Sequence, residues 1–366
     1  MKNKYVFVLV LLLSILIISF GFTNIYVSQN QRAEEEDFVV VTSFYPMYIA
    51  AMNVIGDTDG VTLQNLSEPQ TGCLHDFQLT PADMKLLSTA DVFIINGGGI
   101  ESFMEDIAKQ YPDLVVIEAC EGIELLCEED AHGHDEDVHI HEIEDVHPEE
   151  HETESEHIHE TESEHAEEHG TESGHIHDDE MEEHNMDLED THDGHNHDVN
   201  AHVWMSVKNY RKQIENIADG LAAASPDYAE SFLANAGAYD GKLEELQVEQ
   251  EKLFTLTKEK EVILFHCAYD YVVDDLGLET AFCMDLDEER QVSAGEVAEV
   301  LNVIASHDVK YIFAEELYGK SMCGLVQKEA DVKVIYLDPL NRGEYEADSY
   351  LEGMRENLKL IREMFH

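Results

Sequence analysis

Histidine dominates one stretch of this 366-residue chain. Sixteen of its 21 histidines lie between His132 and His197, together with 26 Asp and Glu residues and no Lys or Arg. Neutral imidazoles suit zinc, copper and nickel, and carboxylates attract dications. The stretch therefore predicts transition-metal binding, with weak accessory ligation by eight of its histidines: His132, His134, His139, His141, His175, His177, His195 and His197.

Three histidines outside that stretch are candidates for a defined site. His75 lies in a loop before a helix, His202 directly precedes a helix, and His266 follows the apolar run at 262–265. Open α/β sheets bind ligands in loops at the carboxyl ends of their strands. We therefore expect these three imidazoles to bind a metal together.

A tetrahedral metal site needs a fourth ligand, and Asp338 follows another apolar run. His75 and His202 belong to the first half of the chain, and His266 and Asp338 to the second, which predicts a site between two lobes. Three imidazoles and one carboxylate suit Zn²⁺, whereas Mn²⁺ prefers more oxygen. Glu315 also ends a strand, where it either orients a histidine or occupies the site itself.

The six cysteines form no CxxC pair, which excludes a zinc ribbon. Cys73 and Cys267 lie within two residues of His75 and His266, so thiolate ligation at either, or a disulfide between them, is an alternative. Cys120 and Cys127 are spaced for a local disulfide. An exported protein permits such bonds.

Short apolar runs alternate with helical patterns along the chain, which predicts an α/β fold with largely parallel sheets. Strands are expected at 37–43, 91–96, 114–117, 262–265, 309–313 and 332–337. Helices are expected near 48–55, 206–224, 227–257, 269–276, 294–306, 319–330 and 349–365, with Pro226 in the first turn of the long one.

These elements divide the chain into four parts. An N-terminal lobe at 37–225 contains a polar, repetitive loop at 121–198 that cannot bury enough surface to order without metal. A linking helix at 226–257 leads to a C-terminal lobe at 258–366. Residues 1–34, with two lysines before an apolar run, predict a signal peptide or an uncleaved membrane anchor.

The formal net charge is −59, of which 26 negative charges lie in the histidine-rich stretch. Binding to nucleic acid requires basic patches, so a nucleic-acid partner is excluded. The charge suits a soluble protein that attracts cations.

Several phrases occur in an order typical of one protein family. They are SFYPMY, HDFQLTPADMKLLSTADVFIINGGGIE, NAHVWMS, LFHCAYDYVVDDLGL, IFAEE and DSYLEGMRENL. With them the chain resembles the cluster A-I solute-binding proteins of bacterial metal ABC transporters, in the zinc-binding branch, over nearly all residues beyond 38. The family usually has Asp-Pro-His-x-Trp in its second motif, where this chain has Asn200-Ala201-His202-Val203-Trp204.

The resemblance implies two similar α/β lobes joined by one long rigid helix, with the metal between them. It implies ligation by His75, His202, His266 and Asp338, and His266 favours zinc because the manganese branch commonly has Glu there. We expect an exported, monomeric binding protein on the extracytoplasmic face of the membrane, which hands Zn²⁺ to an ABC permease driven by a cytoplasmic ATPase.

Three other functions remain open on these residues. A zinc-dependent hydrolase would use Glu315 as the base beside a metal-bound water, but no HExxH motif is present. A surface metal store or adhesin would depend on the histidine-rich stretch. A manganese receptor is the alternative within the family. We expect a binding protein and not an enzyme.

Overall fold

The computed structural model describes residues 37–74, 77–126, 199–286 and 291–366, all within one compact unit. They contain two sheets of four parallel strands. The first holds β1 (Phe38–Thr42), β2 (Val61–Asn65), β3 (Val92–Ile95) and β4 (Val115–Glu118). The second holds β5 (Glu261–Leu264), β6 (Glu279–Cys283), β7 (Tyr311–Ala314) and β8 (Lys333–Tyr336).

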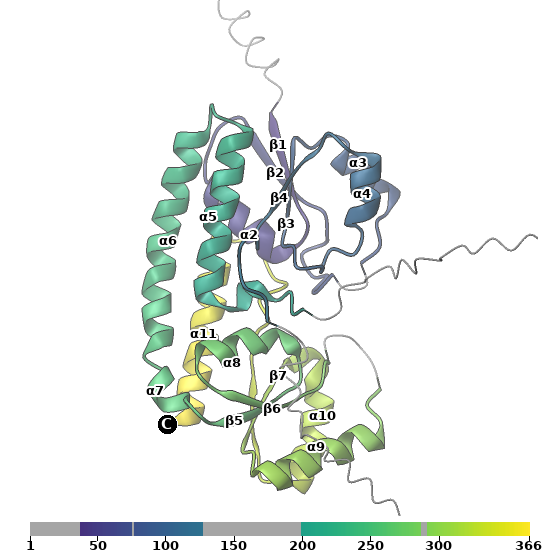
Figure 1. Ribbon diagram of the computed structural model, residues 1–366, viewed down its shortest axis with the longest axis vertical. Helices are drawn as coiled ribbons and strands as arrows, with labels where there is room; N and C mark the ends of the chain where they lie inside the picture. The colour runs from purple at the N-terminus through teal and green to yellow at the C-terminus, as the bar shows by residue number, and fades with distance from the viewer. Residues whose placement is uncertain (1–36, 75–76, 127–198, 287–290) are drawn as a thin grey trace, which may run out of the picture. The chain divides into compact units, whose positions relative to one another are not determined.

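The two sheets share one strand order, β2-β1-β3-β4 in the first and β6-β5-β7-β8 in the second, with every pair parallel. This repetition confirms the prediction of two similar α/β lobes (Figure 1). The inner strands are apolar runs, as strands covered on both faces must be. The sequence reading missed β2 and β6, which are equivalent edge strands with half-exposed, mixed residues that give no apolar run.

Ten α-helices and two short 3₁₀ turns, η2 (Val203–Met205) and η3 (Cys267–Tyr269), are described. The helices are α2 (Tyr45–Ile55), α3 (Pro81–Leu87), α4 (Met104–Gln110), α5 (Val207–Ala224), α6 (Ala229–Glu251), α7 (Phe254–Thr257), α8 (Asp270–Asp275), α9 (Ala294–His307), α10 (Glu316–Glu329) and α11 (Ser349–Phe365). The α4 helix was not predicted. Ser206 caps α5, accepting a hydrogen bond from the Asn209 amide at 3.3 Å.

The predicted long linking helix is present as α6, but it begins later than expected and is interrupted before α7. Its first turn lies outside the helix, because the backbone at Pro226 forms a turn before α6 begins. After α6 the chain turns at Leu253, whose side chain is buried, and resumes as α7. The Thr257 hydroxyl donates to the Leu276 carbonyl at 2.6 Å, which ties α7 to the end of α8.

The α6 helix contacts elements of both halves. It packs along α5 and against α2 beside the first sheet, and against α11, which covers β8 of the second sheet (Figure 1). One buried apolar cluster holds residues of both sheets, including Val40 and Phe93 with Leu264 and Phe313. The two halves therefore share a core, which limits their independent movement.

The chain on either side of the histidine-rich stretch meets at one point. The Asn200 amide donates to the Leu126 carbonyl at 2.8 Å, and the Leu126 amide donates to the Tyr271 hydroxyl at 3.2 Å. These bonds order residues 121–126, which the sequence reading had placed in a disordered loop; residues 127–198 lie outside the described residues.

The N-terminal segment 1–34, predicted as a signal or anchor, also lies outside the described residues. Within the part of the chain that the structure describes, none of the helices combines the length and apolar character required to span a bilayer.

Candidate metal centre

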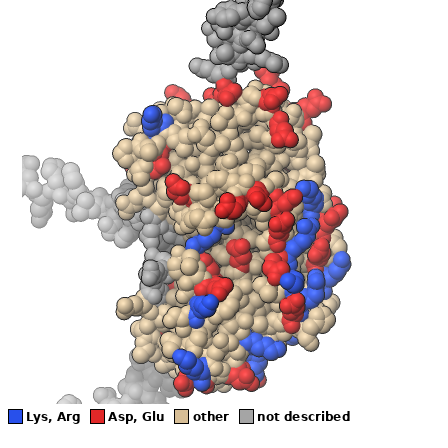
Figure 2. Space-filling model, turned by 180° about the vertical axis from the view of Figure 1, so that it is seen from behind, with Lys and Arg blue, Asp and Glu red and all other residues tan. Residues whose placement is uncertain are grey.

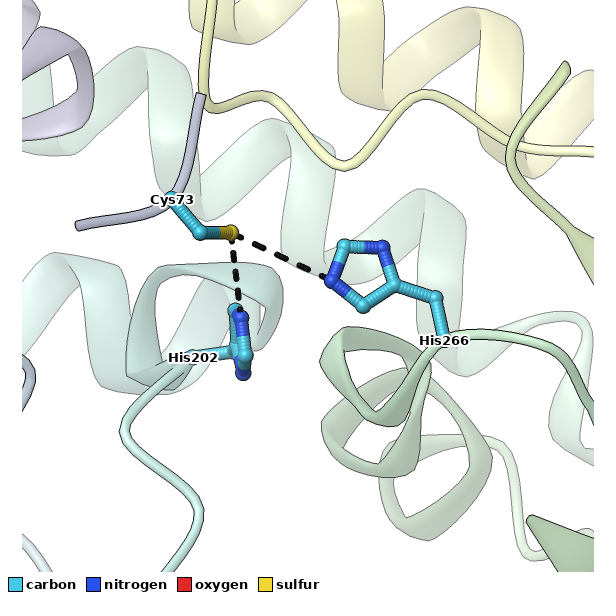
Figure 3. Close-up of side chains that lie close together, drawn as sticks. All are labelled: Cys73, His202 and His266. Carbon is cyan, nitrogen blue, oxygen red and sulfur yellow. Dashed lines mark hydrogen bonds between the residues drawn. The ribbon is translucent and has the colours of Figure 1, made fainter. Parts of the chain in front are cut away.

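Three side chains from distant parts of the sequence converge at the ends of the two sheets. They are Cys73 in the loop after β2, His202 at the start of η2, and His266 just after β5 (Figure 3). Their potential ligand atoms all lie within 4.8 Å of one another. The Cys73 Sγ atom lies 3.3 Å from His202 Nε2 and 3.9 Å from His266 Nε2.

His202 is held by the side chain of Asn200. The Asn200 Oδ1 atom lies 2.9 Å from His202 Nδ1 and accepts the His202 backbone amide at 3.0 Å. The Asn200 amide nitrogen donates to the Cys267 carbonyl at 2.7 Å and to Asp270 at 3.1 Å, so its oxygen must face the ring. The proton of His202 is therefore held on Nδ1, and Nε2 presents its lone pair to the centre.

Glu315 lies beside Nδ1 of His266, although these two atoms do not form a hydrogen bond as Asn200 and His202 do. Glu315 Oε2 lies 3.4 Å from His266 Nδ1, and both side chains are buried. Arg342 pairs with the other carboxylate oxygen of Glu315 at 3.1 Å. Burial disfavours the charged imidazole, but the contacts with Cys73 and Glu315 outweigh it and raise the pKa of His266.

Cys73 is placed by contacts between its loop and the loop after β8. Gly72 has a φ of +86°, and a Cβ there would lie 2.9 Å from the Arg342 guanidinium, so glycine permits this close approach. The Asn341 amide nitrogen donates to Cys73 Sγ at 3.0 Å, while the Asn341 oxygen accepts from Arg342 at 3.2 Å. The sulfur thus receives a directed donor from a buried side chain.

Cys267 lies on the other side of the His202 ring. Its sulfur is 3.8 Å from His202 Nδ1 and donates to Asp285 at 3.4 Å. Burial raises the pKa of Cys267 well above its usual range. The two sulfurs approach opposite ring nitrogens and are not bonded to each other, so the structure places Cys73, and not Cys267, in the centre.

Asp338 lies beside the centre but outside the group of three. Its Oδ1 atom accepts the Leu340 amide at 2.8 Å, and its backbone exchanges two hydrogen bonds with the Asn357 side chain. Burial, together with the charge of Glu315, raises the pKa of Asp338. One oxygen of the carboxylate is thus engaged in its own turn, and ligation of metal by Asp338 remains a prediction.

Trp204 joins the His202 segment to the Asp338 loop. Its indole nitrogen donates to the Pro339 carbonyl at 2.9 Å, and its ring is fully buried against Phe44. The Tyr350 hydroxyl on α11 donates to the Trp204 carbonyl at 2.8 Å. These bonds, with those of Asn200, hold the loop although it lacks the proline of the usual motif.

Of the four predicted ligands, the structure brings His202 and His266 together and leaves Asp338 at the edge, while His75 lies outside the described residues. The eight accessory histidines also lie outside them. Cys73 was considered only as an alternative. Two imidazoles and a sulfur offer a borderline-to-soft ligand set, and Glu315 stands behind His266, where it can orient the ring.

The sequence matches one family across most of its length. The profile of the family described as zinc-uptake complex component A, periplasmic (ZnuA) covers residues 40–364. The chain belongs to this family. Membership confirms the resemblance seen in the motifs, and the ZnuA family is one of binding components for zinc uptake, not of enzymes.

The relatives of this chain include a protein named for zinc binding. The zinc-binding protein AdcA of Streptococcus pyogenes serotype M3 is 28% identical over 358 residues, which cover 96% of this chain and 61% of that relative. The chain thus spans less than two thirds of the length of this relative.

Two solved structures share the fold. Zn(II)-bound AdcA from Streptococcus pneumoniae aligns with a TM-score of 0.63 at 23% identity, covering 89% of this chain and 57% of that chain. The solute-binding protein FpvC of Pseudomonas aeruginosa, in complex with Mn²⁺, aligns with a TM-score of 0.63 at 22% identity, covering 89% and 99%.

Proposed function

We propose that this chain is the extracytoplasmic zinc-binding component of an ABC importer. It captures Zn²⁺ at a centre built on His202 and His266 between the two lobes, and delivers it to a membrane permease driven by a cytoplasmic ATPase. His75 and Asp338 remain the other ligands expected from the sequence. One observation carries the proposal: the Nε2 atoms of two buried imidazoles both approach Cys73 Sγ, at 3.3 Å and 3.9 Å, within one group of potential ligand atoms no more than 4.8 Å apart.

This arrangement suits reversible capture of a dication better than hydrolysis. Glu315 contacts His266 Nδ1 and Arg342, so it is engaged on the far side of the ring from the centre. A hydrolytic base would instead have to reach a metal-bound water. The zinc named for AdcA and the family's description support zinc as the cargo, and the Mn²⁺ named for FpvC makes manganese the competitor to test.

Metal titration of the purified chain tests the proposal. Competition with a zinc chelator should reveal one tight Zn²⁺ per chain, confirmed by elemental analysis. His202→Ala and His266→Ala should each weaken that site by about 100-fold or more, because each removes a ligand whose supporting contacts are already in place. His307→Ala is the matched control, since His307 is half-exposed on α9 and lies 3.6 Å from Glu261, away from the centre.

Other outcomes identify the rival functions. Tighter binding of Mn²⁺ than of Zn²⁺ would mean a manganese receptor, and many equal weak sites would mean a store. Ester or peptide hydrolysis that disappears in His266→Ala would mean an enzyme. Transport itself is tested in cells lacking the chain, where growth in zinc-poor medium should be restored by the unaltered chain and not by His202→Ala.

A further inference from the structure

We propose that Cys73 is a metal ligand, and that its thiolate makes this a mixed sulfur–nitrogen centre which takes Zn²⁺ and softer divalent ions such as Cd²⁺ and rejects Mn²⁺. The inference rests on the proposed function, because it names the class of ion that the same centre accepts. The sequence motifs predict histidine and carboxylate ligands, and the inference adds a cysteine to them.

The distances fit ligation. In a tetrahedral zinc site, with Zn–N of about 2.0–2.1 Å and Zn–S of about 2.3 Å, neighbouring ligand atoms lie roughly 3.3–3.6 Å apart. Cys73 Sγ lies 3.3 Å from His202 Nε2 and 3.9 Å from His266 Nε2, and all three ligand atoms fall within 4.8 Å (Figure 3). A shift of a few tenths of an ångström would bring the sulfur to the spacing of a ligand.

The surroundings of the sulfur also suit a thiolate. The Asn341 amide nitrogen donates to Cys73 Sγ at 3.0 Å, and Asn341 is 1% exposed. Its orientation is fixed because its oxygen accepts from Arg342. Hydrogen bonds from buried groups behind a ligand orient it and favour its charged form. On binding, a sulfur–metal bond forms and the thiol proton passes to solvent.

Cys267 is also close to His202, but its position does not suit metal ligation. It is close to the same ring, but on the Nδ1 side that Asn200 occupies, and its thiol is directed at Asp285. Of these two cysteines, Cys73 is the one that faces the Nε2 atoms of both rings. Soft thiolate ligands favour zinc and softer ions, whereas manganese prefers oxygen.

Cobalt provides a direct test on the full chain. Co²⁺ replaces Zn²⁺ in such sites, and a thiolate bound to it produces a charge-transfer absorption in the near ultraviolet that imidazoles and carboxylates cannot produce. The unaltered chain and Cys120→Ser should show the band, and Cys73→Ser should lose it. Cys120 is a suitable control because it is buried beside Glu118, at the end of the first sheet.

Affinity and labelling supply independent readouts. Cys73→Ser should weaken Zn²⁺ binding by about tenfold or more and Mn²⁺ binding far less, so the preference for zinc falls by about tenfold. In the unaltered chain, Zn²⁺ should protect Cys73 from iodoacetamide, as measured by mass spectrometry, and equal Mn²⁺ should not. This measurement does not depend on whether a variant folds.

The results separate the two proposals. Tight Zn²⁺ binding that requires His202, without a thiolate band or protection of Cys73, would overturn the role of Cys73 and leave the proposed function standing. A chain that binds no Zn²⁺ would overturn both. A thiolate band that persists in Cys73→Ser would also overturn the inference, since another cysteine would then supply the ligand.

Discussion

At the scale of single residues, the centre depends on the groups that hold its imidazoles. Asn200 stands where the usual motif has aspartate, and its oxygen lies 2.9 Å from His202 Nδ1. Its amide nitrogen donates hydrogen bonds to the Cys267 carbonyl and to the Asp270 carboxylate, two groups of the second half of the chain. Asn200 therefore orients a ligand and also joins the two halves at the centre.

Replacing Asn200 by alanine should weaken zinc binding by about 10- to 100-fold, as expected when a group that orients a metal ligand is lost. Chelator competition measures the affinity. Asn235→Ala is the matched control, since the Asn235 side chain likewise donates two hydrogen bonds, to the backbone carbonyls of Val54 and Ile55, away from the centre. Equal zinc affinity in both variants would contradict this role.

The sequence predicted the places of His202 and His266 well, because each borders a strong apolar run or helix start. It favoured His75 over Cys73 as the ligand in the first loop, and His75 lies outside the described residues. Residues two apart in an extended segment face the same side, so spacing alone leaves both able to reach the centre. Contacts of Gly72 with Arg342 and of Cys73 with Asn341, about 270 residues away in the chain, place the sulfur.

At the scale of elements, the turn after β3 is built around a buried carboxyl group. Glu101 is 4% exposed and accepts hydrogen bonds from the Ser43 hydroxyl and from the amides of Asn96 and Gly97. Those donors favour the anion, but burial outweighs them and raises the pKa of Glu101 from 4.5 to about 7. Between pH 4.5 and about 7, Glu101 is therefore protonated in the folded chain and ionised in the unfolded chain.

The contribution of Glu101 to the free energy of unfolding should consequently fall by roughly 3 kcal/mol as the pH rises from about 4.5 to 7. Above that range this contribution should stay level. Glu101→Gln cannot titrate and should lack this part of the dependence. Urea unfolding of both metal-free proteins at pH 5 and pH 8 measures the difference. Parallel changes in the two proteins would show that Glu101 is charged throughout.

Most elements could be predicted because their inner strands are apolar and their helices carry ordinary start signals, such as Ser206 before α5 and Ser293 before α9. The edge strands β2 and β6 could not be predicted, since apolar and polar residues alternate only weakly in half-exposed strands. Such strands form because they pair with a neighbouring strand. The break between α6 and α7 likewise depends on Leu253 and Thr257 contacting the second lobe.

At the scale of the whole molecule, the few basic side chains are largely neutralised. Figure 2 shows Lys and Arg mixed with Asp and Glu along one side of the face in view. Ion pairs on α5, α6 and α11 include Arg211 with Asp240 at 2.6 Å and Lys242 with Asp348 at 2.9 Å. The acidic residues exceed the basic ones, and the net charge of −59 creates a negative electrostatic potential that attracts cations and repels polyanions.

The histidine-rich stretch leaves and rejoins the described chain at Leu126 and Asn200, beside His202. We propose that it collects Zn²⁺ weakly near the centre. Deleting residues 132–197 should leave one tight site and remove several weak ones, because a polar repetitive sequence is not expected to preorganise its imidazoles as the centre does. Isothermal titration measures both classes. Loss of the tight site with the deletion would contradict a separate centre.

The sequence by itself determined the class of fold, the expectation of metal binding and two of the side chains at the centre, because apolar patterns and helix capping are local properties of the chain. Only the tertiary structure decided which nitrogen of each imidazole faces the centre and that a cysteine lies beside them. Those features depend on Asn200, Glu315 and Asn341, whose partners lie far along the chain. Such contacts exist only after both sheets have formed and packed on one core.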